Sequence, residues 1–276
     1  MPQILICFSR VVHKPQLTLD HALSQRNFTD ELMTALDPNR TVTRYRKNWR
    51  FSQPKIMNQK YLVGKLGFIS SVQESITDYD ENQKDFTQQS IDIRQATFSQ
   101  WAVDLSTQMI AFETKPPKIR FQSFIGAYKG ILNQHPETGF TVEQILESAK
   151  FFDWVGKLDR ITRFTASIRA PNPDFASRPR IIRELLEDTN AVSAKVELKS
   201  EQSLNTEKTI VQDLVDYGED GYSRIVAYGE QNGHKQTFDS KREIATERID
   251  TPSTLLLNVD IVWNRIIEVL SRKSSK

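Results

Sequence analysis

One cysteine and four histidines are the only thiol and imidazole groups in the 276-residue sequence. Because Cys7 is the single thiol, no disulfide can form within the chain, and its apolar neighbours favour burial as a small hydrophobic side chain. The histidines are scattered, so together with one thiol they lack the ligand spacing of a zinc site. We therefore expect no metal or cofactor held by these groups. The histidines are His13, His21, His135 and His234.

Several catalytic and nucleotide-binding motifs are missing as well. The sequence has no Gly-x-Ser-x-Gly elbow, and nothing in it places a histidine beside Cys7, so covalent catalysis is not supported. Gly64 and Gly67 are too few for a dinucleotide fingerprint, and no Gly-Lys-Ser or Gly-Lys-Thr phosphate loop occurs. The common routes to nucleotide binding are therefore excluded.

An excess of charge of one sign is also absent, since 37 cations face 35 acids for a net charge of +2. Any attraction for phosphate must therefore come from local clusters of cations. The longest apolar runs are far shorter than a membrane span, and the N-terminal MetProGln lacks the basic start and apolar stretch of a secretion signal. We expect a cytoplasmic protein without a membrane partner.

Hydrophobic residues make up 38% of the sequence and charged residues 26%, which allows a real core in one large domain or two small ones. Apolar and polar residues alternate over 162–168 and 192–198, which predicts two strands joined by a crossover helix over 177–186. AsnGly at 232–233 predicts a hairpin turn. We expect an α+β fold with mixed or antiparallel sheets, hairpins, packed helices and a long C-terminal amphipathic helix. The other expected strands span 3–12, 61–69, 101–105, 109–112, 222–228 and 235–238, and the other expected helices span 27–36, 121–132, 142–152, 207–215 and 254–270.

Three further expectations concern organisation. The acid-rich segment 74–85 has few apolar residues and is typical of a solvated loop. The helix over 142–152 would be capped by Thr141, with Gln144 completing a capping box. The turn at 135–139 predicts an N-terminal lobe over 1–135 and a C-terminal lobe over 140–276, with one continuous domain as the alternative.

The segment from Arg40 to Lys55 carries six cations and three aromatics without a carboxylate. Cations beside flat rings are typical of surfaces that bind a phosphate backbone and stack on bases. A second cationic region, from Lys157 to Arg183, would line the same groove. In the alternative interpretation, the aromatics anchor a loop on the core and the arginines are solvated or paired with acids. The candidate residues for binding DNA or RNA are Arg44, Tyr45, Arg46, Lys47, Trp49, Arg50, Arg163 and Arg169.

Two other functions stay open. Asp104, Glu113 and Lys115 have the order of acid, then acid-x-Lys, in which the carboxylates of a nuclease would hold Mg²⁺ and the lysine would steady the attacking water. Similar spacings recur elsewhere in the chain, so surface charge on a hairpin is the competing interpretation. The helix over 254–270 has two apolar stripes, which predicts either burial within its own fold or contact with a protein partner or second copy.

Five short runs resemble an uncharacterised bacterial domain family. They are SerIleArgAlaProAsnProAsp (167–174), AlaLysValGluLeuLysSer (194–200), AlaTyrGlyGluGlnAsnGlyHis (227–234) and, more loosely, TyrLeuValGlyLysLeuGlyPhe (61–68) with AlaPheGlu (111–113). Members of that family occur near mobile elements and phage-defence genes. The resemblance implies a place in such a system, and it supplies no functional residue to match.

Overall fold

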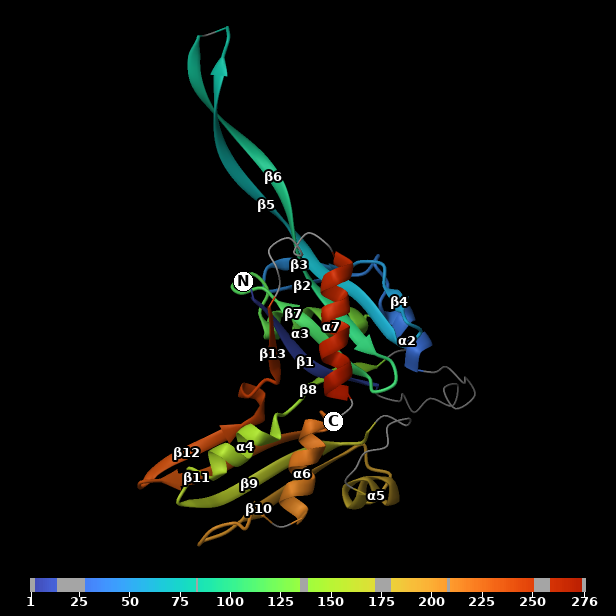
Figure 1. Ribbon diagram of the computed structural model, residues 1–276, viewed down its shortest axis with the longest axis vertical. Helices are drawn as coiled ribbons and strands as arrows, with labels where there is room; N and C mark the ends of the chain where they lie inside the picture. The colour runs from blue at the N-terminus through green and yellow to red at the C-terminus, as the bar shows by residue number, and fades with distance from the viewer. Residues whose placement is uncertain are drawn as a thin grey trace.

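The computed structural model describes residues 3–13, 28–82, 84–134, 139–171, 180–207, 209–250 and 259–274. Strands account for 49% of the structure and helices for 27%, so the fold is α+β in the coarse sense and mostly β. Two sheets lie one beyond the other, and a long β-ribbon projects from the far end of the larger one (Figure 1). Every strand pairing among the described residues is antiparallel.

The larger sheet has nine strands in the order β13-β1-β7-β6-β5-β3-β2, with β4 paired to β5 and β8 paired to β1. Both faces of β1 are buried, as its alternating apolar residues predict. Its strands are β1 (Gln3–His13), β2 (Thr41–Arg44), β3 (Lys47–Phe51), β4 (Lys55–Met57), β5 (Tyr61–Asp80), β6 (Asp85–Asp104), β7 (Met109–Thr114), β8 (Phe140–Gln144) and β13 (Thr246–Asp250).

Helices cover both faces of this sheet. On one face, α2 (Phe28–Ala35) and α3 (Phe121–Leu132) pack against a core that includes Trp101 and Phe112. On the other face, α7 (Val259–Ser274) buries Trp263 against the sheet, and its indole Nε1 donates a hydrogen bond to the Gly64 carbonyl at 3.2 Å. The apolar side chains described on α7 therefore serve the chain's own core. Residues 251–258, the start of the helix expected over 254–270, lie outside the described residues.

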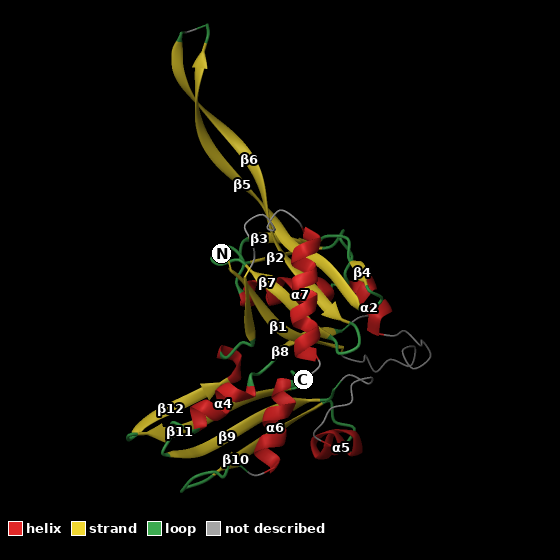
Figure 2. Ribbon diagram, viewed as in Figure 1, coloured by secondary structure: helices red, strands yellow, loops and turns green. Residues whose placement is uncertain are grey.

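The smaller sheet has the order β10-β9-β11-β12. Its helices lie on one face, where Phe151, Phe164 and Leu214 join a third core (Figure 2). None of the helices described for this sheet covers its other face, which we call the open face. The strands and helices are α4 (Ser148–Val155), β9 (Arg160–Arg169), α5 (Arg180–Asp188), β10 (Ser193–Lys199), α6 (Thr209–Glu219), β11 (Ser223–Gln231), β12 (His234–Asp239) and the 3-10 turn η1 (Ser240–Arg242).

The acid-rich segment 74–85 is not a loop, contrary to the sequence expectation. Strands β5 and β6 pair without interruption from Tyr61 with Asp104 to Asp80 with Asp85, which makes a twisted two-stranded ribbon. The prediction was wrong because it took a lack of apolar residues as the mark of a loop. A ribbon that is exposed on both faces has no face that must be apolar. The hairpin expected at 101–112 is present as β6 and β7.

The helix expected over 142–152 is also wrong in its first half. Residues 140–144 form β8, which pairs with the second half of β1, and the helix starts at Ser148. Thr141 caps no helix, since its hydroxyl donates to the Glu143 carboxylate at 2.7 Å. Pairing with a distant strand overrides the local capping pattern.

One expected connection differs from the structure. Strands β9 and β10 are antiparallel neighbours, so α5 does not make the parallel crossover that the alternating pattern suggested. From the second half of the chain, β8 and β13 belong to the larger sheet and α7 packs against it. Among the described helices, none has the length and apolar content needed to cross a membrane.

Candidate nucleic-acid interface

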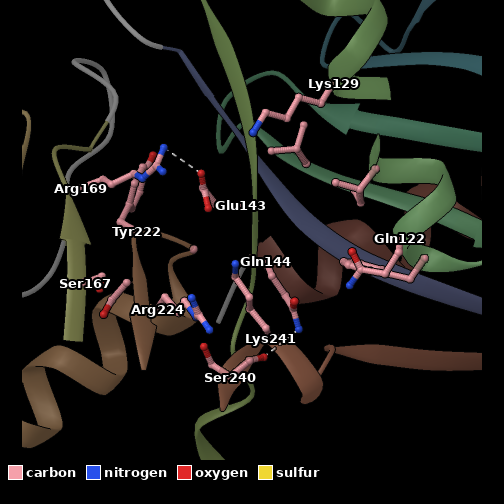
Figure 3. A pocket seen from close by; sticks show the side chains of 15 residues that line it. Gln122, Lys129, Glu143, Gln144, Ser167, Arg169, Tyr222, Arg224, Ser240 and Lys241 are labelled. Atoms are coloured by element: carbon pink, nitrogen blue, oxygen red, sulfur yellow. Dashed lines mark hydrogen bonds and ion pairs between the residues drawn. The ribbon is translucent and has the colours of Figure 1, made fainter. Parts of the chain in front are cut away.

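A cleft of about 450 Å³ lies between the two sheets (Figure 3). One wall is formed by α3, which packs on the larger sheet. The other wall is formed by β9 and the start of β11 in the smaller sheet, and β8 lies between the two walls. Its lining is amphipathic: apolar side chains from α3 and β8 lie beside cationic and hydroxyl groups. The apolar members are Phe121, Ile125 and Val142.

Four cations converge on this cleft from separate parts of the chain. They are Lys129 on α3, Arg169 on β9, Arg224 on β11 and Lys241 just after β12. Glu143 is the one carboxylate in the lining, so the wall carries a clear positive excess. Such a surface attracts an anion more strongly than the net charge of the whole chain would predict.

Two of the four cations are held in place by carboxylates. Arg169 Nη1 lies 3.0 Å from Glu143 Oε1, and Arg224 Nη2 lies 3.0 Å from Asp239 Oδ2. Although partial burial raises the pKa of Asp239, hydrogen bonds from Arg224 and from the Lys241 backbone outweigh it and lower that pKa below its ordinary value. Among the described residues, no carboxylate pairs with Lys129 or Lys241, so their ammonium groups are the readiest to meet a ligand.

Strand periodicity and one glycine place these side chains. Along β9, the core takes Phe164, Ala166 and Ile168, which leaves Ser167 and Arg169 on the open face. In the turn before β11, Gly221 adopts a φ of +80°, and a Cβ there would lie 2.9 Å from the Cβ of Arg10. Glycine therefore allows the smaller sheet to approach β1 closely.

Arg10 forms one of the contacts between the two sheets. Its guanidinium lies 5.2 Å from the ring centroid of Tyr222, a cleft residue, and its Nη1 donates to the Thr107 carbonyl. Burial lowers the pKa of Arg10 from its ordinary value. A buried guanidinium engaged with both sheets fixes their relative position at this point.

The turn between β2 and β3 reaches the same helix, α3, that forms one cleft wall. Tyr45 Oη donates to the Gln122 carbonyl at 3.2 Å, and a Cβ at Gly126 would lie only 2.9 Å from that hydroxyl. A Cβ at Gly130 would lie 3.6 Å from Arg44 Nε. Since Gln122 and Lys129 line the cleft, the structure places Arg44 and Tyr45 against the helix that forms one cleft wall, whereas Arg169 belongs to the other wall.

The basic segment does not act as one surface, however. Trp49 is fully buried, its indole Nε1 donates to the Arg44 carbonyl at 3.1 Å, and its ring packs on Phe68. It cannot stack on a base, and the anchoring interpretation describes it correctly. Arg50 follows Trp49 along β3 and therefore points to the opposite face of the sheet. Arg46 is exposed in the turn.

Lys47 and Arg163 both have partners within the chain. The Lys47 ammonium donates to the Lys118 carbonyl at 2.8 Å and lies 4.1 Å from the ring centroid of Phe68. Arg163 pairs with Glu197 and packs over the ring of Tyr228 at 5.6 Å. Arg163 shares the open face of the smaller sheet with Arg169, whereas Lys47 mainly supports the turn.

The structure separates the residues of the expected nuclease site. Glu113 reaches the backbone of Gln100 on β6, and Asp104 lies four residues farther along that strand, about 13 Å away. This distance is too great for one metal ion. Within the described part of the chain, no group of three or more acids, histidines or cysteines is arranged to hold a metal.

Both carboxylates have structural roles instead. Asp104 is fully buried and accepts hydrogen bonds from the Ser106 hydroxyl at 2.6 Å and from the Ser106 backbone, which closes the turn after β6. Lys115 lies 3.0 Å from Glu113 and packs over the ring of Phe98. The spacing of Asp104, Glu113 and Lys115 suggested a nuclease site. In the structure it follows from side chains that alternate between the two faces of the β6–β7 hairpin.

Sequence reasoning found Arg169 but missed the other three cations of the cleft. Buried and exposed residues alternate along β11, so the sequence could have predicted that Arg224 lies on the open face of the smaller sheet. No local signal links Lys129 or Lys241 to Arg169, because the three lie on elements far apart in the sequence. Their convergence depends on how the two sheets are joined.

Comparison with known proteins identifies the family. No curated protein matches the sequence. A family model described as a domain of unknown function, DUF4747, matches residues 27–268, a range that includes every charged residue of the cleft. The resemblance to an uncharacterised domain family is thereby confirmed, and the chain belongs to the DUF4747 family.

Proposed function

We propose that this protein binds the phosphate backbone of DNA or RNA in the cleft between its two sheets, without catalysing a reaction on it. The observation that carries the proposal is the convergence of Lys129, Arg169, Arg224 and Lys241 on a cleft with one carboxylate. Phosphate contacts supply most of the affinity of sequence-independent nucleic-acid binding. The cleft offers such contacts from both walls.

Two neighbouring surfaces extend this path. The turn at Arg44 to Arg46 packs against α3, the helix that carries Lys129. On the other side, the open face of the smaller sheet continues through Ser167 to Lys195, which lines a second hollow with Arg169. A backbone longer than the cleft would therefore meet cations at both ends.

The apolar lining adds a second type of contact. Phe121, Ile125 and Val142 lie among the cations, and apolar groups beside cations suit a base or sugar next to its phosphate. The resemblance noted in the sequence supports a role within a bacterial defence or mobile-element system, and the proposal places that role in the cytoplasm.

Fluorescence anisotropy across a salt series tests the proposal. Labelled single-stranded DNA, single-stranded RNA and duplex DNA are titrated with protein between about 50 and 300 mM KCl, and affinity is expected to fall by about three to four log units per log unit of salt, as four phosphate contacts predict. Lys129→Gln and Lys241→Gln are each expected to reduce that slope by about one.

Arg265→Gln is the matched control. Arg265 lies on α7, on the other face of the larger sheet, and is exposed and paired with Glu268 at 2.7 Å. Its loss removes one cation from the protein but none from the cleft, so the slope is expected to stay unchanged. Absence of salt-dependent binding to all three ligands, or equal slopes for the cleft variants and the control, would refute the proposal.

A further inference from the structure

The outer half of the β5–β6 ribbon, residues 70–95, makes little contact with the rest of the described chain, and we refer to it as the arm. At its base, Lys118 Nζ donates a hydrogen bond to Gln95 Oε1 at 3.4 Å. Among the described residues, its strands pair only with each other, since β3 pairs with β5 no farther than Phe68 and β7 pairs with β6 from Trp101 onward. The arm extends about 35 Å beyond the sheet, at about 3.3 Å per residue. Figure 1 shows it projecting away from both sheets.

The arm is strongly acidic. It carries six carboxylates against Lys84 and Arg94, a net charge of −4 in a chain whose total is +2. The rest of the protein is therefore distinctly basic. The carboxylates are Glu74, Asp78, Asp80, Glu81, Asp85 and Asp92.

The arm also exposes large apolar side chains near its tip. Tyr79 and Phe86 face each other across the strands with ring centroids 5.2 Å apart, and they are 42% and 72% exposed. Ile91 and Ile93 are about 40% exposed on the other face of the ribbon. An isolated two-stranded hairpin is only marginally stable in water. The exposed rings are typical of a surface that is completed by a partner.

We propose that the arm binds in the cleft of a second copy of this chain. The cleft has the complementary character, since cations surround an apolar patch of Phe121, Ile125 and Val142, while the arm presents carboxylates around Tyr79 and Phe86. A chain's own arm points away from its own cleft, so this contact joins two molecules (Figures 1 and 2). Pairing of two arms is disfavoured because each carries a charge of −4.

Reciprocal exchange of arms gives a closed dimer with two identical arm–cleft contacts. The contact is electrostatic at its rim and apolar at its centre, so it weakens with salt without depending on charge alone. The arm and a phosphate backbone would compete for the same cations of the cleft. The tests of the arm contain no nucleic acid, so either proposal can fail without the other.

Sedimentation velocity measures the association directly. The full chain, at about 1 to 100 µM, is expected to form a dimer that dissociates as salt rises from about 50 to 500 mM. Replacing residues 72–93 with AsnGly joins Ser71 to Arg94 across a paired position and should give a monomer at all concentrations. The double variant Tyr79→Ser with Phe86→Ser is expected to weaken the dimer at least tenfold while keeping the ribbon.

Charge reversal in the cleft supplies the reciprocal test. Lys129→Glu with Lys241→Glu should weaken the dimer as much as the tip variant does, whereas Arg265→Glu on α7 should not. A full-length protein that stays monomeric at about 100 µM in low salt, or a dimer that survives removal of the arm, would overturn the inference.

Disulfide trapping locates the contact. Burial raises the pKa of Cys7 to about 11, so the native thiol stays unreactive and engineered cysteines report alone. A mixture of Thr87→Cys and Lys129→Cys proteins should form a mixed disulfide between two copies on a non-reducing gel. A mixture of Thr87→Cys and Arg265→Cys proteins should not. Equal yields from both mixtures would show random collision and would count against the arm–cleft contact.

Discussion

Glu113 and Asp104 are both buried carboxylates, but their neighbours shift their pKa values in opposite directions. Burial raises the pKa of Glu113 above its ordinary value, and the nearby Lys115 compensates only in part. Burial also acts to raise the pKa of Asp104, but hydrogen bonds from Ser106 and the ammonium of Lys60 at 3.2 Å outweigh it and lower that pKa. The acid, acid-x-Lys motif would assign Asp104 and Glu113 to one metal site. Their ionised forms instead have opposite effects on the free energy of unfolding.

Glu113→Gln should abolish the part of the pH dependence of stability that comes from ionisation of the Glu113 carboxyl. A carboxyl with a raised folded-state pKa binds its proton more tightly in the folded protein, so the free energy of unfolding falls as pH rises from the ordinary value of 4.5 through the raised one. A neutral amide has no such dependence. Melting temperatures of both proteins between about pH 4 and 8 should converge at the acid end, with the variant the more stable above it.

Asp104→Asn is the control for that experiment, with the opposite sign. Its carboxylate contributes stability above pH 3.8 that is lost as pH falls through the lowered folded-state pKa. The variant should lose about 2 to 4 kcal/mol at pH 7 and approach the wild type in acid. Equal pH profiles for Glu113→Gln and the wild type would contradict the assignment of Glu113.

At the scale of elements, β5 and β6 combine two different environments in one pair of strands. Near the sheet, Leu62, Val63 and Trp101 are fully buried, whereas the arm beyond Ile69 is exposed on both faces. The same backbone ladder therefore has a packed half and an unpacked half. Local stability follows the number of buried apolar contacts rather than the ladder itself.

Hydrogen exchange should reveal this boundary. In dilute protein at high salt, amides over 71–94 should exchange orders of magnitude faster than those over 61–68 and 97–104, because opening the arm exposes no core. At high concentration and low salt, the arm should gain protection if it binds in a second copy. Mass spectrometry of peptides from both regions provides the measurement, and uniform protection along the ribbon would contradict it.

At the scale of the molecule, the two sheets meet at Arg10 and Gly221. The guanidinium of Arg10 packs on Tyr222, while the backbone at Gly221 approaches the Arg10 side chain too closely for a Cβ. Together with the ion pair between Arg169 and Glu143, this contact joins the walls from which the four cations reach the cleft.

Gly221→Ala should therefore be more harmful than its backbone angle alone implies. A methyl group would lie 2.9 Å from the Arg10 Cβ in addition to the cost of a φ of +80°. Gly233→Ala is the matched control, since φ is +76° there and nothing lies within 4 Å of the added methyl. Urea unfolding should show a loss of about 1 kcal/mol for Gly233→Ala and about 2 to 4 kcal/mol for Gly221→Ala. Equal losses would show that the sheets do not depend on this contact.

The strongly periodic elements could be predicted from the sequence. β1, β9 and the AsnGly hairpin follow from alternation and turn chemistry, and α3 has the bounds 121–132 that its apolar spacing predicts. Residues 140–144 and 74–85 could not be predicted, because one segment becomes a strand by pairing with β1 and the other by pairing with itself away from any core. Of the candidate site, the sequence pointed to Arg169, Arg44 and Tyr45.

By itself, the sequence determined the α+β character, the buried faces of its regular elements and the presence of cationic segments, since these depend on composition and local period. Only the tertiary structure decided which segments act together. It separated Asp104 from Glu113, buried Trp49, turned Arg50 to the opposite face and brought Lys129 and Lys241 to Arg169. The physical reason is that side-chain convergence depends on long-range pairing and on the packing of the two sheets, neither of which leaves a mark on neighbouring residues in the chain.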